Sequence, residues 1–280
     1  MSDRRVLVFG GSGLLGRHLV ERGESSGWDV HATHHQSPPP ACRQTYCGDL
    51  VDALFIASTV EAAAPTHIIN AAYVQSGPNV NEVCALAPES MAIAARDVGA
   101  KFVHVSTDLV FDGTLGRPYR EDDPTSPLTE YGRAKVDSER RVLGLGTGSV
   151  VARTSLIYGE ATAPQETLVR RAHDDGDIAF FTDEWRTAVH VADLAAALFD
   201  LATTEVTGLL HVAGSERLNR LEFAQVLARA LGLDADRLAG RTQDPALGPR
   251  PADVSLDTTV AQELGLDLPG PTSRLTSGYR

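Results

Sequence analysis

A tyrosine and a lysine lie four residues apart in the chain, at Tyr131 and Lys135. In a helix this spacing places the phenol and the ammonium on the same face, one turn apart. A neighbouring ammonium favours the phenolate, so we expect the pKa of Tyr131 to fall from about 10 towards neutral pH. Such a pair can give a proton to the alkoxide that forms when a ketone is reduced. The alternative is an ordinary pair on a solvated helix surface.

Three polar residues, Ser106, Thr107 and Asp108, directly follow the strand that we expect over Lys101–Val105. In open parallel sheets, ligands bind at the carboxyl ends of the strands. A Ser or Thr hydroxyl at that end can hold the oxygen of a ketone during reduction. These residues would therefore complete a site for ketone reduction; the alternative is that they only form a turn.

Glycines occur at positions 10, 13 and 16, directly after the apolar run Val6–Phe9 and at the start of an expected helix. Gly10 permits a tight turn, Gly13 lets backbone amides approach a pyrophosphate, and Gly16 lets the helix pack closely on the sheet. The helix amino terminus adds a local positive dipole. The spacing indicates dinucleotide binding; the alternative is a glycine turn that serves packing only.

The end of the second expected strand bears on the choice of cofactor. An acidic residue there would bind the ribose hydroxyls of NADH and repel a 2′-phosphate, but the chain continues Thr33-His34-His35-Gln36-Ser37. We therefore expect NADPH, with His34, His35 or Ser37 near its 2′-phosphate, and NADH as the other option.

A zinc site is the competing interpretation of this histidine-rich region. Its candidate ligands are His31, His34, His35, Cys42 and Cys47. In a strand, His34 faces away from His31 and His35, and the spacing fits no standard zinc site. We expect no metal.

The first 155 residues alternate apolar runs with helical stretches, which indicates a parallel sheet covered by helices on both faces. Expected strands are Arg5–Phe9, Asp29–Thr33, Gln44–Cys47, His67–Asn70, Lys101–Val105 and Ser149–Arg153. Expected helices run from Leu14 to about Gly23, over Val51–Ala63, about Asn81–Val98, and Tyr131 to about Leu143. The prolines at 38–40 predict that a loop alone joins the second and third strands.

The later part of the chain alternates less regularly. We expect helices at about Gln165–Asp174, His190–Ala202 and Leu218–Leu231, and a strand at Leu209–Ala213. Asn219 and Glu222 predict a capping box. The fold class is α/β: a Rossmann-type doubly wound parallel sheet with a smaller α/β carboxy-terminal substrate lobe. The expected domains are 1–155, which binds NAD(P), and 156–280, with 190–213 returning to the first.

Composition excludes several classes of protein. The 280 residues are 42% hydrophobic and carry a formal net charge of −12, which disfavours nucleic acids and anionic membranes as partners. Three cysteines are too few for a disulfide framework. No apolar run approaches the roughly 20 residues of a membrane span, and the start of the chain lacks the pattern of a signal peptide. We expect a cytoplasmic protein.

Several motifs, in this order along the chain, resemble the extended short-chain dehydrogenase/reductase family. They are Gly10-x-x-Gly13-x-x-Gly16, Gly48-Asp49-Leu50, Asn70-Ala71-Ala72, the segment 106–113 and Tyr131-Gly132-x-x-Lys135. Within that family the chain is similar to the dTDP-4-dehydrorhamnose reductases and to the regulatory β subunit of methionine adenosyltransferase. The closer similarity rests on 119–128, Arg153-Thr154-Ser155, Tyr158-Gly159, His190-Val191-x-Asp193 and Arg250-Pro251.

The resemblance implies a catalytic trio of Thr107, Tyr131 and Lys135. The expected cofactor contacts are Gly10, Ser12, Gly13, Leu14, Leu15, Gly16, His34, His35, Asp49 and Leu50 (at the adenine), Ala71 and Ala72 (at the ribose), Ser106, Tyr131, Lys135, and Thr154 and Ser155 (near the nicotinamide). The expected substrate contacts are Thr107, Asp108, Tyr131, Trp185 and Arg250. Arg250 would hold the diphosphate of a nucleotide sugar; the alternative for Arg250-Pro251 is a surface turn.

Two positions depart from the pattern of related enzymes. Cys84 occupies the place where family members usually carry an asparagine that supports a proton relay, and a thiol hydrogen-bonds weakly. Asp108 is followed by Leu109, where nucleotide-sugar 4,6-dehydratases carry a glutamate, which argues against dehydration.

The leading expectation is an NADPH-dependent reductase of a keto group on a nucleotide-activated deoxysugar. The alternatives are a non-catalytic NADP-binding regulatory or scaffold protein and a nucleotide-sugar epimerase of the same fold. The expected partner is a small-molecule substrate, with no nucleic acid or membrane, and a homodimer is an open option.

Overall fold

The structure, a computed structural model, describes residues 4–244, 246 and 248–276. The chain divides into two compact units. Unit 1 comprises Met1–Val110, Thr129–Arg153 and Ala195–Leu210, and unit 2 comprises Phe111–Leu128, Thr154–Leu194 and His211–Arg280. As a division into functional domains, the expected boundary near residue 155 and the return of residues 190–213 stay predictions.

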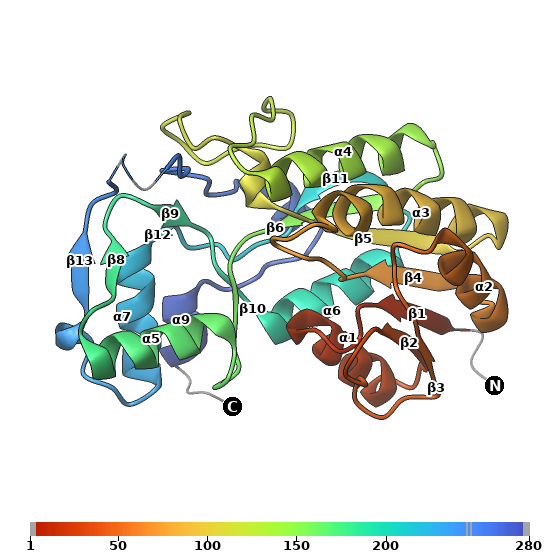
Figure 1. The fold of residues 1–280 in the computed structure, drawn as a ribbon, viewed down its shortest axis with the longest axis horizontal. Coiled ribbons are helices and arrows are strands. Elements are labelled where there is room, and N and C mark those ends of the chain that lie inside the picture. Colours follow the sequence, from red (N-terminus) through yellow and green to blue (C-terminus); the bar gives the residue numbers. More distant parts are fainter. Residues whose placement is uncertain (1–3, 245, 247, 277–280) are drawn as a thin grey trace. The chain divides into compact units, whose positions relative to one another are not determined.

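A seven-stranded sheet forms the centre of unit 1 (Figure 1). Its strands, in spatial order, are β11 (Gly208–His211), β6 (Val150–Thr154), β5 (Lys101–Thr107), β4 (His67–Asn70), β1 (Arg5–Phe9), β2 (Asp29–His34) and β3 (Gln44–Cys47). The β1–β2, β1–β4, β2–β3 and β4–β5 pairs are parallel. The strand order reverses direction between β1 and β4, which is the point where open α/β sheets bind ligands.

Helices cover both faces of this sheet, as expected for strands that are apolar on both sides. Helices α2 (Ala53–Ala63), α3 (Ala87–Asp97) and α4 (Glu130–Gly144) lie on one face, and α1 (Leu14–Ser25) and α6 (Val191–Ala202) lie on the other (Figure 1). Buried residues of α2, α3 and α4 pack with Leu7, Phe9, Ile68 and Phe102 of the sheet in one core cluster. The predicted doubly wound α/β fold is confirmed.

The long elements agree with the sequence to within a few residues, but one helix differs in kind. The expected helix at 81–98 consists of a π-helical turn, η1 (Glu82–Leu86), followed by α3. Pro88 has no N–H, so the α-helical hydrogen bond to the carbonyl of Cys84 cannot form, and a wider turn occurs there. The turn brings Cys84 into the buried interior.

Two further boundaries correct the expectation. His190 belongs to strand β10 (Val189–His190), and α6 begins after it, at Val191. Leu218 and Asn219 form strand β12, and α7 (Arg220–Ala230) begins after them, with the predicted Asn219–Glu222 capping box present. Strands of two or three residues are too short to produce a periodic pattern, so the sequence could not predict them.

Unit 2 is a smaller α/β assembly of short strands and helices. Its strand pairs are β7 (Ile157–Tyr158) with β10, β9 (Trp185–Arg186) with β12, and β8 (Ala179–Phe181) with β13 (Ala239–Arg241). Its helices include α5 (Pro164–Asp175), α7, α8 (Thr259–Glu263) and α9 (Pro271–Thr276). Tyr158, Phe180, Phe223 and Leu227 lie in its apolar core.

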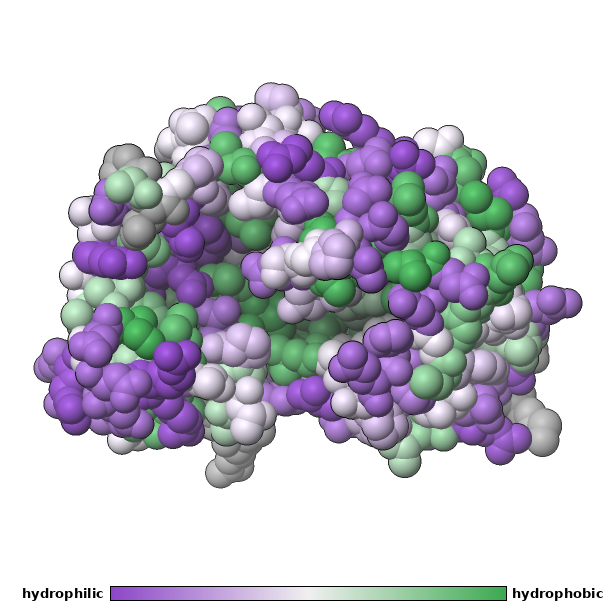
Figure 2. Space-filling model, viewed as in Figure 1, coloured by the Kyte–Doolittle hydropathy of each residue, from purple (hydrophilic) through white to green (hydrophobic). Residues whose placement is uncertain are grey.

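The visible face of the molecule is mostly hydrophilic, with apolar side chains interspersed (Figure 2). Leu54, at the start of α2, is a large apolar side chain that is 80% exposed. In the part of the chain that the structure describes, no helix has the length and apolar character to span a bilayer.

Candidate active site

The glycine turn between β1 and α1 is closed by backbone contacts. Gly10 has φ +82°, and an added Cβ would lie 2.8 Å from the backbone of Ala72. A Cβ on Gly16 would lie 2.0 Å from the carbonyl oxygen of Gly10, and the amide of Gly13 donates to the same oxygen at 3.1 Å. Positions 10 and 16 therefore require glycine for the turn to exist at all.

The start of α1 is suited to an anion. The N-cap of α1 is Gly13, which has no side chain to hydrogen-bond the first-turn amides. Those amides and the helix dipole therefore remain available to a pyrophosphate group. A dinucleotide cofactor fits this cradle, because no capping side chain occupies the first-turn amides of α1.

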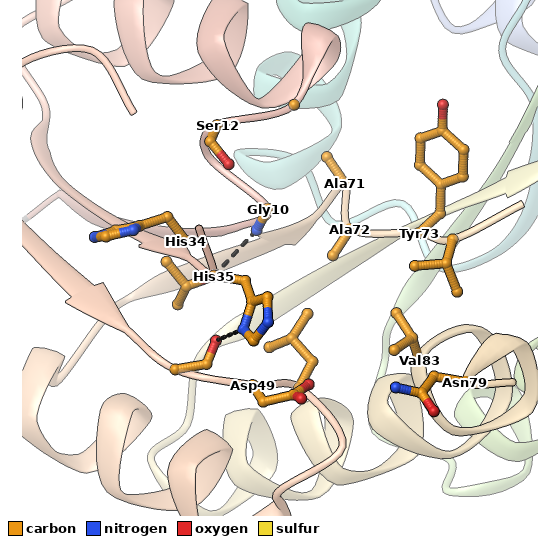
Figure 3. A pocket seen from close by; sticks show the side chains of 15 residues that line it. Gly10, Ser12, His34, His35, Asp49, Ala71, Ala72, Tyr73, Asn79 and Val83 are labelled. Carbon is orange, nitrogen blue, oxygen red and sulfur yellow. Dashed lines mark hydrogen bonds between the residues drawn. The ribbon is translucent and has the colours of Figure 1, made fainter. Parts of the chain in front are cut away.

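A pocket of about 290 Å³ lies beside the glycine turn (Figure 3). It is lined by Gly10, Ser12, Gly13, Thr33, His34, His35, Gly48, Asp49, Leu50, Ala71, Ala72, Tyr73, Val74, Asn79 and Val83. Nine of the residues expected to bind the cofactor are in this set. Leu15 and Gly16 are instead buried in the turn and helix, where Gly16 serves the packing described above.

Sequence reasoning missed one side of this pocket. Tyr73, Val74, Asn79 and Val83 come from the segment between β4 and α3 (Figure 3). This segment has no regular periodicity, and only its position after a strand end could have pointed to it. Tyr73 is 57% exposed, and its ring centroid lies 6.1 Å from that of Tyr131.

The two histidines lie at the pocket wall, at the end of β2. The Nδ1 atom of His35 lies 3.4 Å from the carbonyl oxygen of Gly48, so that nitrogen carries the proton. Asp49 is the carboxylate among the lining residues, and it accepts the amide of Val51 at 3.1 Å. Among the described residues, no three His, Cys, Asp or Glu side chains are grouped so that they could hold a metal ion.

Thr107, Tyr131 and Lys135 all belong to unit 1, where β5 and α4 position them. Thr107 is the last residue of β5, and Tyr131 is in the first turn of α4, whose N-cap Thr129 accepts the amide of Gly132. Buried Lys135 donates from Nζ to the carbonyl oxygen of Val105 at 2.8 Å, and Nζ lies 6.0 Å from the centroid of the Tyr131 ring. Asp108 follows Thr107 in a 3-10 turn and accepts its hydroxyl proton at 3.2 Å.

The pKa of Tyr131 corrects the expectation from the sequence. Burial raises it well above 10, and Cys84, Tyr73 and Asp108 raise it further, while a hydrogen bond with Thr107 lowers it. The Lys135 ammonium is not among these causes, and burial lowers its own pKa. The ring distance of 6.0 Å and the Val105 hydrogen bond explain the difference, because Lys135 points to the strand backbone. Tyr131 is therefore a protonated phenol at neutral pH.

Cys84 lies beside this site but is not exposed as a nucleophile. It is fully buried in a cluster with Val80, Val83 and Ala134, against which Tyr131 packs. Its sulfur accepts the amide of Val74 at 3.4 Å, and its thiol donates to the carbonyl of the same residue at 3.3 Å. Cys84 thus anchors the segment that forms the missed side of the pocket.

Ser106, expected at the cofactor, is buried under the site. Its hydroxyl donates to Glu139 at 2.5 Å, and Glu139 also receives two hydrogen bonds from Arg153, at 2.9 and 2.7 Å. All three side chains are nearly fully buried. This arrangement ties β5 and β6 to α4 by charge-assisted hydrogen bonds.

A second buried network joins β4, β5 and α4. Asn70 donates to His104 Nδ1 at 3.1 Å, His104 Nε2 lies 3.0 Å from the Ser138 hydroxyl, and Ser138 donates to the Lys135 carbonyl at 2.7 Å. Burial holds the pKa of His104 well below 6.5, with Lys135 contributing in the same direction. His104 is therefore neutral in the folded protein.

This neutral histidine makes the stability depend on pH. Below about pH 6.5, His104 of the unfolded chain binds a proton that the folded protein does not bind, so the free energy of unfolding falls as the pH decreases. The expected loss from this group is about 1 kcal/mol between about pH 7.5 and about pH 5.5. Urea unfolding of the wild type and of His104→Gln at both pH values isolates the contribution of His104, because the contributions of the other titratable groups cancel in the difference between the two proteins. A wild-type advantage that does not shrink at the lower pH contradicts this account.

Four residues that the sequence predicts at the cofactor or the substrate, Thr154, Ser155, Trp185 and Arg250, belong to unit 2. Arg250 forms an ion pair with buried Glu184, and its guanidinium lies 4.9 Å from the Phe181 ring centroid. The guanidinium of Arg217 stacks on the Trp185 ring at 3.9 Å. Thr154 and Ser155 are buried. The roles of Trp185, Arg250, Thr154 and Ser155 at the cofactor or substrate stay predictions.

Comparison with known proteins agrees with this geometry. The family described as RmlD substrate binding domain matches residues 4–272. Methionine adenosyltransferase 2 subunit beta of Xenopus laevis is 30% identical over 282 residues, covering 94% of this chain and 83% of that protein. The dTDP-4-dehydrorhamnose reductase of Mycobacterium tuberculosis (strain ATCC 25618 / H37Rv) is 34% identical over 267 residues, covering 89% and 82%.

A solved structure shows the same fold. The dTDP-4-dehydrorhamnose reductase of Bacillus anthracis, crystallised in complex with NADP, superposes with a TM-score of 0.83 at 23% identity and covers 99% of this chain and 98% of that one. The predicted resemblance to the extended short-chain dehydrogenase/reductases, and within them to the dTDP-4-dehydrorhamnose reductases, is confirmed. The chain belongs to the RmlD substrate binding domain family.

Proposed function

We propose that this chain is an NADPH-dependent reductase of a keto group on a nucleotide-activated deoxysugar. The observation that carries the proposal is the placement of Thr107, Tyr131 and Lys135 at the carboxyl end of β5, in the unit that holds the glycine turn. The 34% identical relative named dTDP-4-dehydrorhamnose reductase supports the class of reaction and of substrate.

Each residue of the trio has a different role in the reduction. Thr107 holds the carbonyl oxygen of the substrate by its hydroxyl. When bound, NADPH supplies a hydride to the carbonyl carbon. Tyr131 donates its phenolic proton to the oxygen, and its raised pKa suits this role because the phenol stays protonated until an alkoxide, a far stronger base, forms beside it. Lys135, whose ammonium bonds the carbonyl of Val105 at the end of β5, is the proposed contact of the cofactor ribose.

The surroundings of the pocket favour NADPH over NADH. His34 and His35 lie at the end of β2, where a carboxylate would otherwise repel a 2′-phosphate. We assign these two histidines to the 2′-phosphate, Asp49 and Leu50 to the adenine, and Ala71 and Ala72 to the ribose. In unit 2, Trp185 and Arg250 are the proposed contacts of the nucleotide sugar.

A turnover assay tests the proposal. Purified protein is mixed with NADPH and a dTDP-4-keto-6-deoxyhexose, and NADPH oxidation is followed by absorbance. We expect oxidation that depends on the ketone, with the corresponding dTDP-hexose that lacks a carbonyl as the inert control. NADPH that stays reduced with every nucleotide-linked ketone in a panel would rule out the reductase.

A second candidate function is a regulatory subunit that binds NADP without turnover. It is favoured by the 30% identity to methionine adenosyltransferase 2 subunit beta over 94% of this chain, and by the thiol of Cys84 at the place of the usual relay asparagine. A fluorescence titration separates the two. Tight NADPH binding without oxidation, together with a change in methionine adenosyltransferase activity on mixing, is the result expected of the regulatory subunit.

A further inference from the structure

An uninterrupted chain of hydrogen bonds runs under the site from the pocket wall to the helix that carries Lys135. The amide of Ala72 donates to Asn70 Oδ1 at 3.0 Å, and Asn70 Nδ2 bonds His104 Nδ1 at 3.1 Å. His104 Nε2 bonds the Ser138 hydroxyl at 3.0 Å, and that hydroxyl donates to the carbonyl of Lys135 at 2.7 Å. Asn70, His104 and Ser138 are at most 1% exposed.

This chain of hydrogen bonds has one consistent arrangement of protons. The backbone carbonyl oxygen of Lys135 can only accept a hydrogen bond, so the Ser138 hydroxyl donates its proton to that oxygen. The Ser138 oxygen must then accept a hydrogen bond from His104 Nε2. His104 Nδ1 is then the acceptor, and Asn70 donates to it with its amide nitrogen. The Asn70 oxygen thereby faces the Ala72 amide, which needs an acceptor. Every link thus fixes the next, and the arrangement holds only for a neutral His104.

The two ends of the chain lie at functional positions. Ala72 lines the pocket, and its backbone lies so close to Gly10 that a Cβ there would be 2.8 Å away. A displacement of Ala72 therefore displaces the glycine turn. At the other end, Lys135 belongs to the first half of α4, and its ammonium bonds the Val105 carbonyl. His104, in the middle of β5, therefore links the cofactor wall, the part of the pocket wall at Ala72, to the helix that carries Lys135.

We propose that His104 is a positioning residue that holds the cofactor wall at Ala72 and the Lys135 helix in a fixed relation. The proposal rests on the proposed function for its effect on turnover, but not for its effect on NADPH binding. An apolar side chain in β5 would fill the same space, yet it would leave the Asn70 donor and the Ser138 acceptor unpaired in the interior. The polar pair at 104 and 106 is thus explained by the two networks it supports.

Three variants test the role of His104. His104→Leu interrupts the chain of hydrogen bonds. His104→Gln keeps one acceptor oxygen and one donor nitrogen at its tip, the same pair that the neutral imidazole presents. Val60→Ala, at a buried position of α2 in the core of unit 1, is the matched control, because it destabilises unit 1 and leaves the hydrogen-bond chain intact.

We expect His104→Leu to raise the Kd for NADPH about tenfold and to lower kcat about 10- to 100-fold, since a small misplacement of reacting groups has effects of this size. The KM for the sugar ketone should change less than about threefold, because no substrate contact is removed. His104→Gln should recover most of both losses. Val60→Ala should lower the melting temperature while leaving Kd and kcat unchanged.

The proposal is overturned if His104→Leu behaves like Val60→Ala, with a lower melting temperature and unchanged Kd and kcat, or if the glutamine variant is no better than the leucine variant. If His104→Leu does not fold, Ser138→Ala breaks the next link and must raise the Kd for NADPH in the same direction; an unchanged Kd overturns the proposal. If the wild type reduces no sugar ketone, the proposed function fails while the NADPH titrations still decide the role of His104.

Discussion

Replacing Tyr131 by phenylalanine is expected to lower kcat for ketone reduction about 100- to 10,000-fold, the usual contribution of a positioned proton donor. This loss corresponds to about 3 to 5 kcal/mol of transition-state stabilisation. The alkoxide would then have to take its proton from water or from a donor that is not positioned beside Thr107. The Kd for NADPH should change less than about threefold, because the ring and Lys135 remain in place.

Tyr158→Phe is the matched control for this change. The Tyr158 hydroxyl is buried in the core of unit 2, and among the described residues it has no hydrogen-bond partner. Its removal should leave kcat unchanged. A Tyr131→Phe variant that retains more than about a tenth of wild-type kcat would show that the proton comes from elsewhere.

Replacing Gly16 by alanine is the second large effect that we expect. In a helix, alanine is normally more stable than glycine by about 0.5 to 1 kcal/mol. At position 16, however, the added Cβ would lie 2.0 Å from the Gly10 carbonyl oxygen and 2.9 Å from the Cα of Gly11, so the turn must open. Such overpacking costs about 1 to 3 kcal/mol of stability. The same displacement moves the amides of the cradle, so NADPH should bind about 10- to 100-fold more weakly.

The same substitution at Gly144 provides the comparison. Gly144 is the last residue of α4, and an added Cβ there meets nothing within 4 Å. Gly144→Ala should leave NADPH affinity unchanged and raise the free energy of unfolding by up to about 1 kcal/mol. Isothermal titration with NADPH and urea unfolding measure both quantities. If both alanine variants bind NADPH as the wild type does, the cofactor does not use this turn.

Elements that carry strong local signals could be predicted from the sequence. The strand Val6–Phe9, the glycine spacing and the Tyr131–Lys135 spacing each follow from short-range geometry, and the structure places these segments in one unit. The capping box at Asn219 was predictable for the same reason, because both partners are within one turn. Local patterns suffice wherever the physical cause lies within a few residues.

Features that depend on packing between distant segments could not be predicted. The segments of Asn70, His104 and Ser138 meet only in the folded sheet, and polar residues in buried strands carry no motif that announces their partners. The direction of the Tyr131 pKa shift was wrong for the same reason. Spacing indicated a nearby ammonium, whereas burial, which spacing does not report, determines the outcome.

Transfer of deuterium tests the central claim most directly. The purified chain is incubated with a dTDP-4-keto-6-deoxyhexose and NADPH that carries deuterium at both hydrogens of the nicotinamide C4, and the sugar product is examined by mass spectrometry and NMR. A reductase that uses this site must place deuterium on the former carbonyl carbon, in the wild type and not in Tyr131→Phe on the same timescale. A sugar recovered without deuterium, from protein that binds NADPH tightly, would contradict the account and favour the regulatory subunit.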